Sequence, residues 1–150
     1  MNRLRLGKVI RLQRRDWGDL LAAQAALLRA QLLVWTRRCG ALLAPVQVAS
    51  NGDATTQDAP PPVRRLAVAI WRAAHYGLFR PSCLVRAVAL HRMLLDRGFP
   101  DTSLRVGVRR QAGTLLAHAW VEYRGVVLAD EEWRVQRFAE LARMGMSPTA

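Results

Sequence analysis

The spacing of apolar residues changes once along this 150-residue chain, close to Gly98 and Pro100. Before that point apolar residues recur every three or four positions, as on the buried face of an α-helix. After it they alternate with polar residues, as on a half-buried β-strand. A chain that places helices first and strands second predicts an α+β fold with a small antiparallel sheet.

Three helices are expected before the change. The first spans residues 17–38, with Asp16 as its N-cap, and the second spans residues 63–75. The third starts at Cys83 and ends before Gly98, a residue type that commonly stops helices.

Three strands are expected after the change, at residues 104–109, 115–123 and 126–129. Short connections between them favour an antiparallel meander. A short amphipathic helix at residues 138–144 is expected to complete the fold.

The length of the chain fits one domain over residues 1–150. Within it, residues 1–49 are expected to form a helical N-terminal arm and residues 63–150 the core of the domain. Residues 50–62 read as a linker or loop, because Asn-Gly, two aspartates and three consecutive prolines disfavour regular structure.

The net charge of +12 arises from 23 basic residues, of which only Lys8 is a lysine. The charge is spread over the chain, with 9 basic and 4 acidic residues in 1–62 and 14 and 7 in 63–150. An arginine-rich solvated face and a basic surface for an acidic peptide or protein partner both remain open. Nucleic acid is not expected, because no zinc-finger, RNA-binding or basic-zipper pattern is present.

The apolar stretch at residues 20–35 contains Gln24, Arg29 and Gln31. An arginine near the centre of a membrane span is costly, so no stable membrane insertion is expected, although a peripheral contact stays open. Two cysteines, Cys39 and Cys83, make no disulfide framework, and the N-terminus shows no signal pattern. We therefore expect a cytoplasmic protein.

Cys83, His118 and Asp130 are the candidate catalytic residues. Cys83 falls in the first turn of a helix, where unpaired N–H groups and the helix dipole favour the reactive thiolate. Residues 122–126 suit a three-residue hairpin loop with Gly125 in the left-handed position, which pairs Glu122 with Val126. That register places His118 directly opposite Asp130, whereas a two-residue loop places them on opposite faces. A histidine held by a carboxylate is the base that a thiol nucleophile needs.

Other residues have plainer roles. His75 and His91 lie in helical patterns and Cys39 reads as an ordinary free thiol. Trp120 shares the face of His118, where it either contacts substrate or packs at the edge of the site. Three adjacent acids from Asp130 onward cannot converge on one ion from a strand, so no metal and no cofactor is expected.

With these residues in place, the chain resembles the stand-alone transglutaminase-like cysteine proteases of lasso peptide biosynthesis. The resemblance covers about residues 60–135 and rests on matching segments at Cys-Leu-Val-Arg-Ala (83–87), Ala-Leu (89–90), Leu-Leu (94–95), Gly98, Val-Gly-Val (106–108), Ala-His-Ala-Trp-Val-Glu (117–122), Gly125 and Asp130. It implies a papain/transglutaminase-like core with the cysteine at a helix N-terminus and the histidine and aspartate on the sheet.

The resemblance also implies a function. Such enzymes remove the leader from a ribosomally made precursor peptide, and a separate cyclase then closes the lasso. Cys83 corresponds to the nucleophile, His118 to the general base and then acid, and Asp130 to the orienting residue. Because the first 60 residues show no leader-recognition domain, a separate recognition protein is the expected partner. A transglutaminase-like acyltransferase or amidase and a non-catalytic peptide-binding module remain the alternatives.

Overall fold

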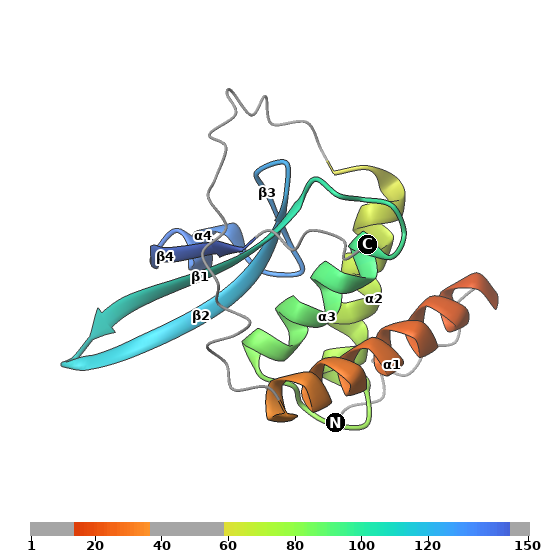
Figure 1. The fold of residues 1–150 in the computed structure, drawn as a ribbon, viewed down its shortest axis with the longest axis horizontal. Helices are drawn as coiled ribbons and strands as arrows, with labels where there is room; N and C mark the ends of the chain where they lie inside the picture. Colours follow the sequence, from red (N-terminus) through yellow and green to blue (C-terminus); the bar gives the residue numbers. More distant parts are fainter. Residues whose placement is uncertain (1–13, 37–58, 145–150) are drawn as a thin grey trace, which may run out of the picture.

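The computed structural model describes residues 14–36 and 59–144 of the chain. Three helices, α1 (Arg14–Thr36), α2 (Pro61–Tyr76) and α3 (Cys83–Leu95), pack against one another beside an antiparallel sheet (Figure 1). The central element is α3, which contacts α1 and α2 on one side and the first two strands of the sheet on the other.

The composition of α3 matches this central position. Most of its side chains are buried, all round the helix, as expected of a helix enclosed by other elements; they are Val85, Ala87, Val88, Ala89, Leu90, His91, Met93 and Leu94. The helix ends before Gly98, which has a φ of 80°, and the Phe99 N–H then bonds to the Leu94 carbonyl oxygen at 3.0 Å. A left-handed glycine that closes a helix in this way is a common C-terminal stop.

The sheet contains four strands in the order β3-β2-β1-β4. They are β1 (Thr102–Gln111), β2 (Thr114–Tyr123), β3 (Val126–Leu128) and β4 (Ala139–Met144), and a short helix, α4 (Glu132–Val135), connects the last two. The predicted α+β class and the meander of the first three strands are therefore confirmed.

The helix boundaries differ from the prediction at two points. Asp16 lies within the first turn of α1, not at its N-cap, because the helix is already formed at Arg14. The start of α2 at Pro61 lies inside the predicted linker. Proline is tolerated in a first helical turn, where a backbone N–H has no helical partner to lose. The predicted end of the first helix at residues 37–38 and most of the predicted linker lie outside the described residues.

The predicted helix at residues 138–144 is wrong, because this segment forms β4. Its pairing with β1 sets Ala139 opposite Val108 and Met144 opposite Leu104. The open edge of β1 offers backbone hydrogen bonds to any segment that reaches it, and such pairing can override a weak local helix pattern.

Candidate active site

Cys83 is the first residue of α3 and has a partly buried, free thiol. The preceding Ser82 caps the helix, and its hydroxyl oxygen accepts a hydrogen bond from the Val85 N–H at 3.4 Å. The cap fixes where the helix begins and therefore where the sulfur stands. At this position the partial positive charge of the helix N-terminus stabilises a thiolate.

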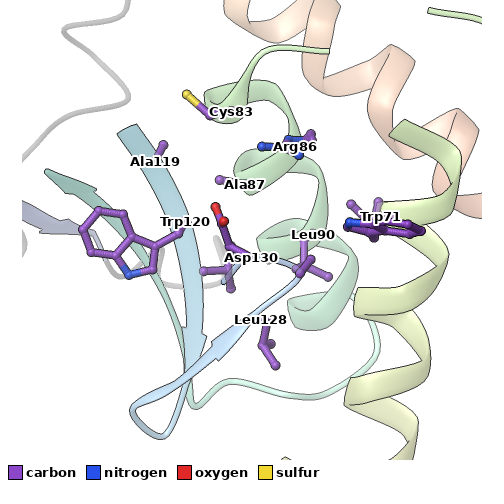
Figure 2. A pocket seen from close by; sticks show the side chains of 12 residues that line it. Trp71, Cys83, Arg86, Ala87, Leu90, Ala119, Trp120, Leu128 and Asp130 are labelled. Atoms are coloured by element: carbon purple, nitrogen blue, oxygen red, sulfur yellow. The ribbon is translucent and has the colours of Figure 1, made fainter. Parts of the chain in front are cut away.

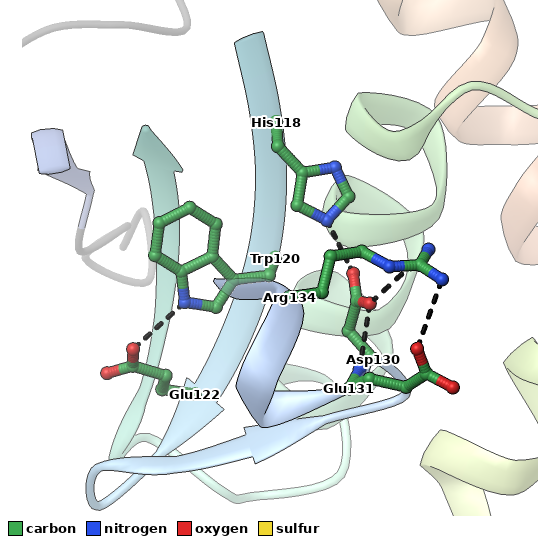
Figure 3. A network of polar contacts seen from close by, with 6 residues as sticks. All are labelled: His118, Trp120, Glu122, Asp130, Glu131 and Arg134. Carbon is green, nitrogen blue, oxygen red and sulfur yellow. Dashed lines mark hydrogen bonds and ion pairs between the residues drawn. The ribbon is translucent and has the colours of Figure 1, made fainter. Parts of the chain in front are cut away.

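His118 lies on β2 and contacts Asp130, which follows β3 (Figure 3). The distance from His118 Nε2 to Asp130 Oδ2 is 2.6 Å, and about one tenth of each side chain is exposed. The other oxygen, Asp130 Oδ1, accepts a hydrogen bond from the Glu131 N–H at 2.8 Å. Because Nε2 is occupied by the carboxylate, Nδ1 is the ring nitrogen left for the cysteine.

The three groups shift one another's pKa. The hydrogen bond to Asp130, then hydrogen bonding to Cys83, raises the pKa of His118 to about 9. Hydrogen bonding to His118 lowers the pKa of the Cys83 thiol; burial opposes this, and the backbone N–H groups of Ala119 and Leu84 support it. Burial pushes the pKa of Asp130 up, but bonds from His118 and the Glu131 N–H outweigh it and leave the value lowered. These directions favour a thiolate–imidazolium pair held by an aspartate.

A family model of the transglutaminase-like superfamily matches residues 21–143. This match includes all three residues of the site and most of the chain. The chain belongs to the transglutaminase-like superfamily. No curated protein matches the chain, and no solved structure matches it either.

The hairpin that positions Asp130 in this transglutaminase-like protein differs from the predicted one. Tyr123 pairs with Val126, so the loop has two residues, Arg124 and Gly125, both with positive φ. The predicted three-residue loop and its pairing of Glu122 with Val126 are wrong. Continued beyond β3, the observed register would place His118 and Asp130 on opposite faces of the sheet.

Ala129 reconciles this register with the observed contact. Its φ of 55° lies in the left-handed region, and β3 ends one residue earlier, at Leu128. A left-handed residue at a strand end turns the chain, so Asp130 is no longer constrained by the alternation of β3. The structure thus brings His118 and Asp130 together through a bend, not through strand pairing.

Trp120 packs beside His118, with the two rings nearly parallel and their centroids 6.2 Å apart. Its indole N–H donates to Glu122 Oε1 at 2.9 Å, and Glu122 Oε2 lies 2.7 Å from Arg105 Nη2. Only 5% of Trp120 is exposed. The indole ring is therefore packed beside His118 in the wall of the candidate site, and substrate contact by Trp120 stays a prediction.

Phe138 forms another part of this wall and was not predicted. Its ring centroid lies 5.2 Å from that of His118, and the Arg109 guanidinium lies 4.9 Å from it. Gly107, directly opposite His118 on β1, provides the room, since a Cβ at this position would lie 2.9 Å from Phe138 Cβ. A glycine inside an otherwise regular strand pattern was the available signal for such a close approach.

Two cavities share lining residues at the site, and Cys83 lines the smaller one. A small one of about 20 Å³ is lined in part by Cys83, Trp71 and Asp130 (Figure 2). A larger one of about 360 Å³ shares Trp71, Arg86, Ala129 and Asp130 with it. Within the part of the chain that the structure describes, the Nε atom of Arg86 is buried without a hydrogen-bond partner. Arg86, whose Nε is a hydrogen-bond donor without a partner among the described residues, thus lines the same small cavity as Cys83.

The remaining histidines lie in other environments. His91 is fully buried, its Nδ1 lies 3.3 Å from Thr102 Oγ1, and burial lowers its pKa to about 4. His75 stacks on Trp71 at a centroid distance of 4.3 Å. Cys39 lies outside the described residues.

The described residues contain neither a candidate metal site nor a candidate membrane span. In residues 14–36 and 59–144, no three His, Cys, Asp or Glu side chains are grouped so as to hold a metal ion. Across the same ranges, no helix combines the length and apolar character needed to cross a bilayer.

Proposed function

We propose that this protein is a cysteine peptidase that removes the leader from a lasso peptide precursor. The observation that carries the proposal is the placement of Cys83 at a helix N-terminus beside His118, which Asp130 holds at 2.6 Å. This arrangement suits nucleophilic acyl transfer from an amide. The choice of substrate rests on the sequence resemblance around Cys83 and His118.

The reaction would proceed in two halves. The Cys83 thiolate attacks the carbonyl carbon of the leader–core amide, and the backbone N–H of Cys83 would donate to the resulting oxyanion. Imidazolium His118 then gives its proton to the amine nitrogen, so the C–N bond breaks and the core leaves with a free amino terminus. The leader remains bound to the sulfur as a thioester.

Water completes the cycle. Neutral His118 accepts a proton from water as the water oxygen attacks the thioester carbon, and the C–S bond breaks. The leader departs as a carboxylic acid that loses its remaining proton to solvent, and the thiolate–imidazolium pair is restored. Asp130 keeps the ring oriented and stabilises its charged form in both halves.

The partners follow from the same proposal. A separate recognition protein would present the leader, and a separate cyclase would use the freed amine. The site works by acid–base and nucleophilic groups of the chain itself, so the proposal requires no cofactor.

Mass spectrometry of a defined mixture tests this function. Precursor, recognition protein and wild-type enzyme should yield a free core and a leader that has gained one water, whereas Cys83→Ala should reduce product to background while still binding. The acyltransferase alternative predicts that an added primary amine, and not water, is found on the leader. An intact precursor after incubation with folded wild-type enzyme and the recognition protein would refute the proposal.

A further inference from the structure

The outward side of α1 carries a row of large apolar side chains, called here the α1 stripe: Trp17, Leu21, Leu28, Leu32 and Trp35. Their spacing places them within about 60° of one another around the helix axis. Between 44% and 78% of each side chain is exposed. Five large apolar residues on one exposed helical stripe exceed the scattered apolar exposure that is ordinary for a protein surface.

The stripe is not the face by which α1 joins the fold. That face carries Ala23, Leu27 and Ala30, which are almost completely buried. It packs on α2 and α3, and an ion pair of 2.8 Å from Asp19 to Arg65 ties α1 to α2. α1 is therefore apolar on two opposite sides, and its attachment to the core explains only one of them.

A groove of about 500 Å³ runs beside the stripe, between α1 and α3. Its floor contains alanines of both helices, and three arginines line it against one acid, Asp96. The arginines are Arg29 of α1, Arg92 of α3 and Arg97 just after α3; the last lies 3.9 Å from Asp19. An occupant of stripe and groove would thus meet an apolar ridge, a shallow apolar floor and net positive charge.

We infer that the α1 stripe and this groove form a docking site for an acidic amphipathic helix of a protein partner. Apolar residues of that helix pack against the stripe and the alanines, while its flanking carboxylates face the arginines. In helix-in-groove binding, an amphipathic helix places apolar residues three and four positions apart against a hydrophobic groove. Cys83 is not among the residues that line the groove, and the inference does not depend on the peptidase function.

Charge disfavours the other occupants. A second copy of a chain with net charge +12 would be repelled, and residues 1–13 carry four basic and no acidic side chains. Residues 37–58 carry two arginines and two aspartates. Their net charge is therefore zero, which gives no net attraction to the arginines of the groove. A flat anionic membrane could meet the stripe, but it would leave the groove beside it unfilled.

Fluorescence anisotropy with a synthetic peptide tests the site. The probe is a labelled peptide of about 18 residues, which spans the roughly 27 Å from Trp17 to Trp35 as a helix. It has leucines on one face and glutamates elsewhere. Two controls are a rearranged peptide of the same composition, with its leucines dispersed round the helix, and a version with lysine for glutamate. Only the first peptide should bind, with a Kd in the micromolar range that rises with salt.

The protein variants are matched by exposure. Leu28→Glu with Leu32→Glu should raise the Kd at least about tenfold. Leu115→Glu, at a leucine near the turn between β1 and β2 that is at least as exposed, should leave the Kd within about twofold. Arg29→Gln with Arg92→Gln should weaken binding and reduce its salt dependence, whereas Arg110→Gln should do neither. Unchanged thermal melting of each variant confirms folding.

Each contrary outcome overturns the inference. Absence of peptide binding, equal binding of the rearranged peptide, or an unaffected stripe variant would each do so. A wild-type dimer in sedimentation that Leu28→Glu with Leu32→Glu dissociates would assign the stripe to a second copy instead. Stripe-dependent binding to anionic phosphatidylserine vesicles without peptide binding would assign it to a membrane.

Discussion

At the scale of single residues, Cys83 and His118 control each other's protonation. Hydrogen bonding to His118 lowers the pKa of the thiol, and the contacts with Asp130 and Cys83 raise the pKa of the imidazole to about 9. Between these two values the thiolate and the imidazolium coexist. In the proposed reaction, the thiol would then be charged before substrate arrives, and the proton for the leaving amine would already be on His118.

Alkylation of Cys83 by iodoacetamide should therefore show two steps with pH, best measured in a Cys39→Ser background. The first step, below the ordinary thiol pKa, reports formation of the ion-paired thiolate. The second, near pH 9, reports loss of the His118 proton, which frees a more nucleophilic thiolate. His118→Ala should show a single step at higher pH than the first. A single step in the wild type, unchanged in His118→Ala, would contradict the ion pair.

The residues of this site could be predicted from sequence, but the geometry that joins them could not. Cys83 at a helix start follows from local signals, and the structure places it there. The two-residue turn instead involves a residue that is distant in sequence. Asp101, just before β1, holds Arg124 by a 2.6 Å ion pair, and its carbonyl oxygen accepts a hydrogen bond from the Arg124 N–H at 3.1 Å. The predicted three-residue loop was based only on the residues of the loop itself, and such local rules do not include a contact with Asp101.

At the scale of elements, the bend at the end of β3 decides whether the site forms. Ala129 holds a left-handed conformation, which costs a non-glycine residue on the order of 1 kcal/mol and a β-branched residue more. Without the bend, the register of β2 and β3 would direct Asp130 away from His118. The left-handed conformation of Ala129 thus links the β2–β3 hairpin to the pKa of the His118 imidazole.

Substitutions at Ala129 should separate the bend from the side chain. Ala129→Gly fits the left-handed conformation and should keep the His118 pKa near 9. Ala129→Val should resist the bend, lower the His118 pKa toward 6.5 and destabilise the fold by roughly 1–3 kcal/mol. NMR titration of the His118 ring and denaturant unfolding measure both effects. Equal pKa values in the two variants would show that the bend does not hold Asp130 in place.

The last strand shows why element type was harder to predict than element position. Residues 138–144 contain Ala, Leu and Met, which favour helices, yet they form β4. Their pairing with β1 shifts register between Val106 and Gly107, so even the strand alternation is interrupted. Long-range pairing with an open edge, which local composition does not encode, determined the outcome.

At the scale of the whole molecule, α3 connects the candidate site to α1. It begins at Cys83, contacts the two longest strands through one side and packs on α1 and α2 through the other. The superfamily match starts at residue 21, within α1. The helix of the predicted N-terminal arm is therefore built into the same core that holds the thiol in place.

Two adjacent leucines of α1 test this integration. Leu27 is fully buried against the core, whereas 44% of Leu28 is exposed. Leu27→Ala should lower the free energy of unfolding by roughly 2–5 kcal/mol through lost burial and the cavity left behind. Leu28→Ala should change it by less than about 0.5 kcal/mol. Urea unfolding followed by circular dichroism, with Cys83 alkylation as the probe of the site, should show one shared transition that Leu27→Ala shifts to lower urea. If α1 were a separate appendage, Leu27→Ala would leave that transition unchanged, because the cysteine would stand on a core that folds without the helix.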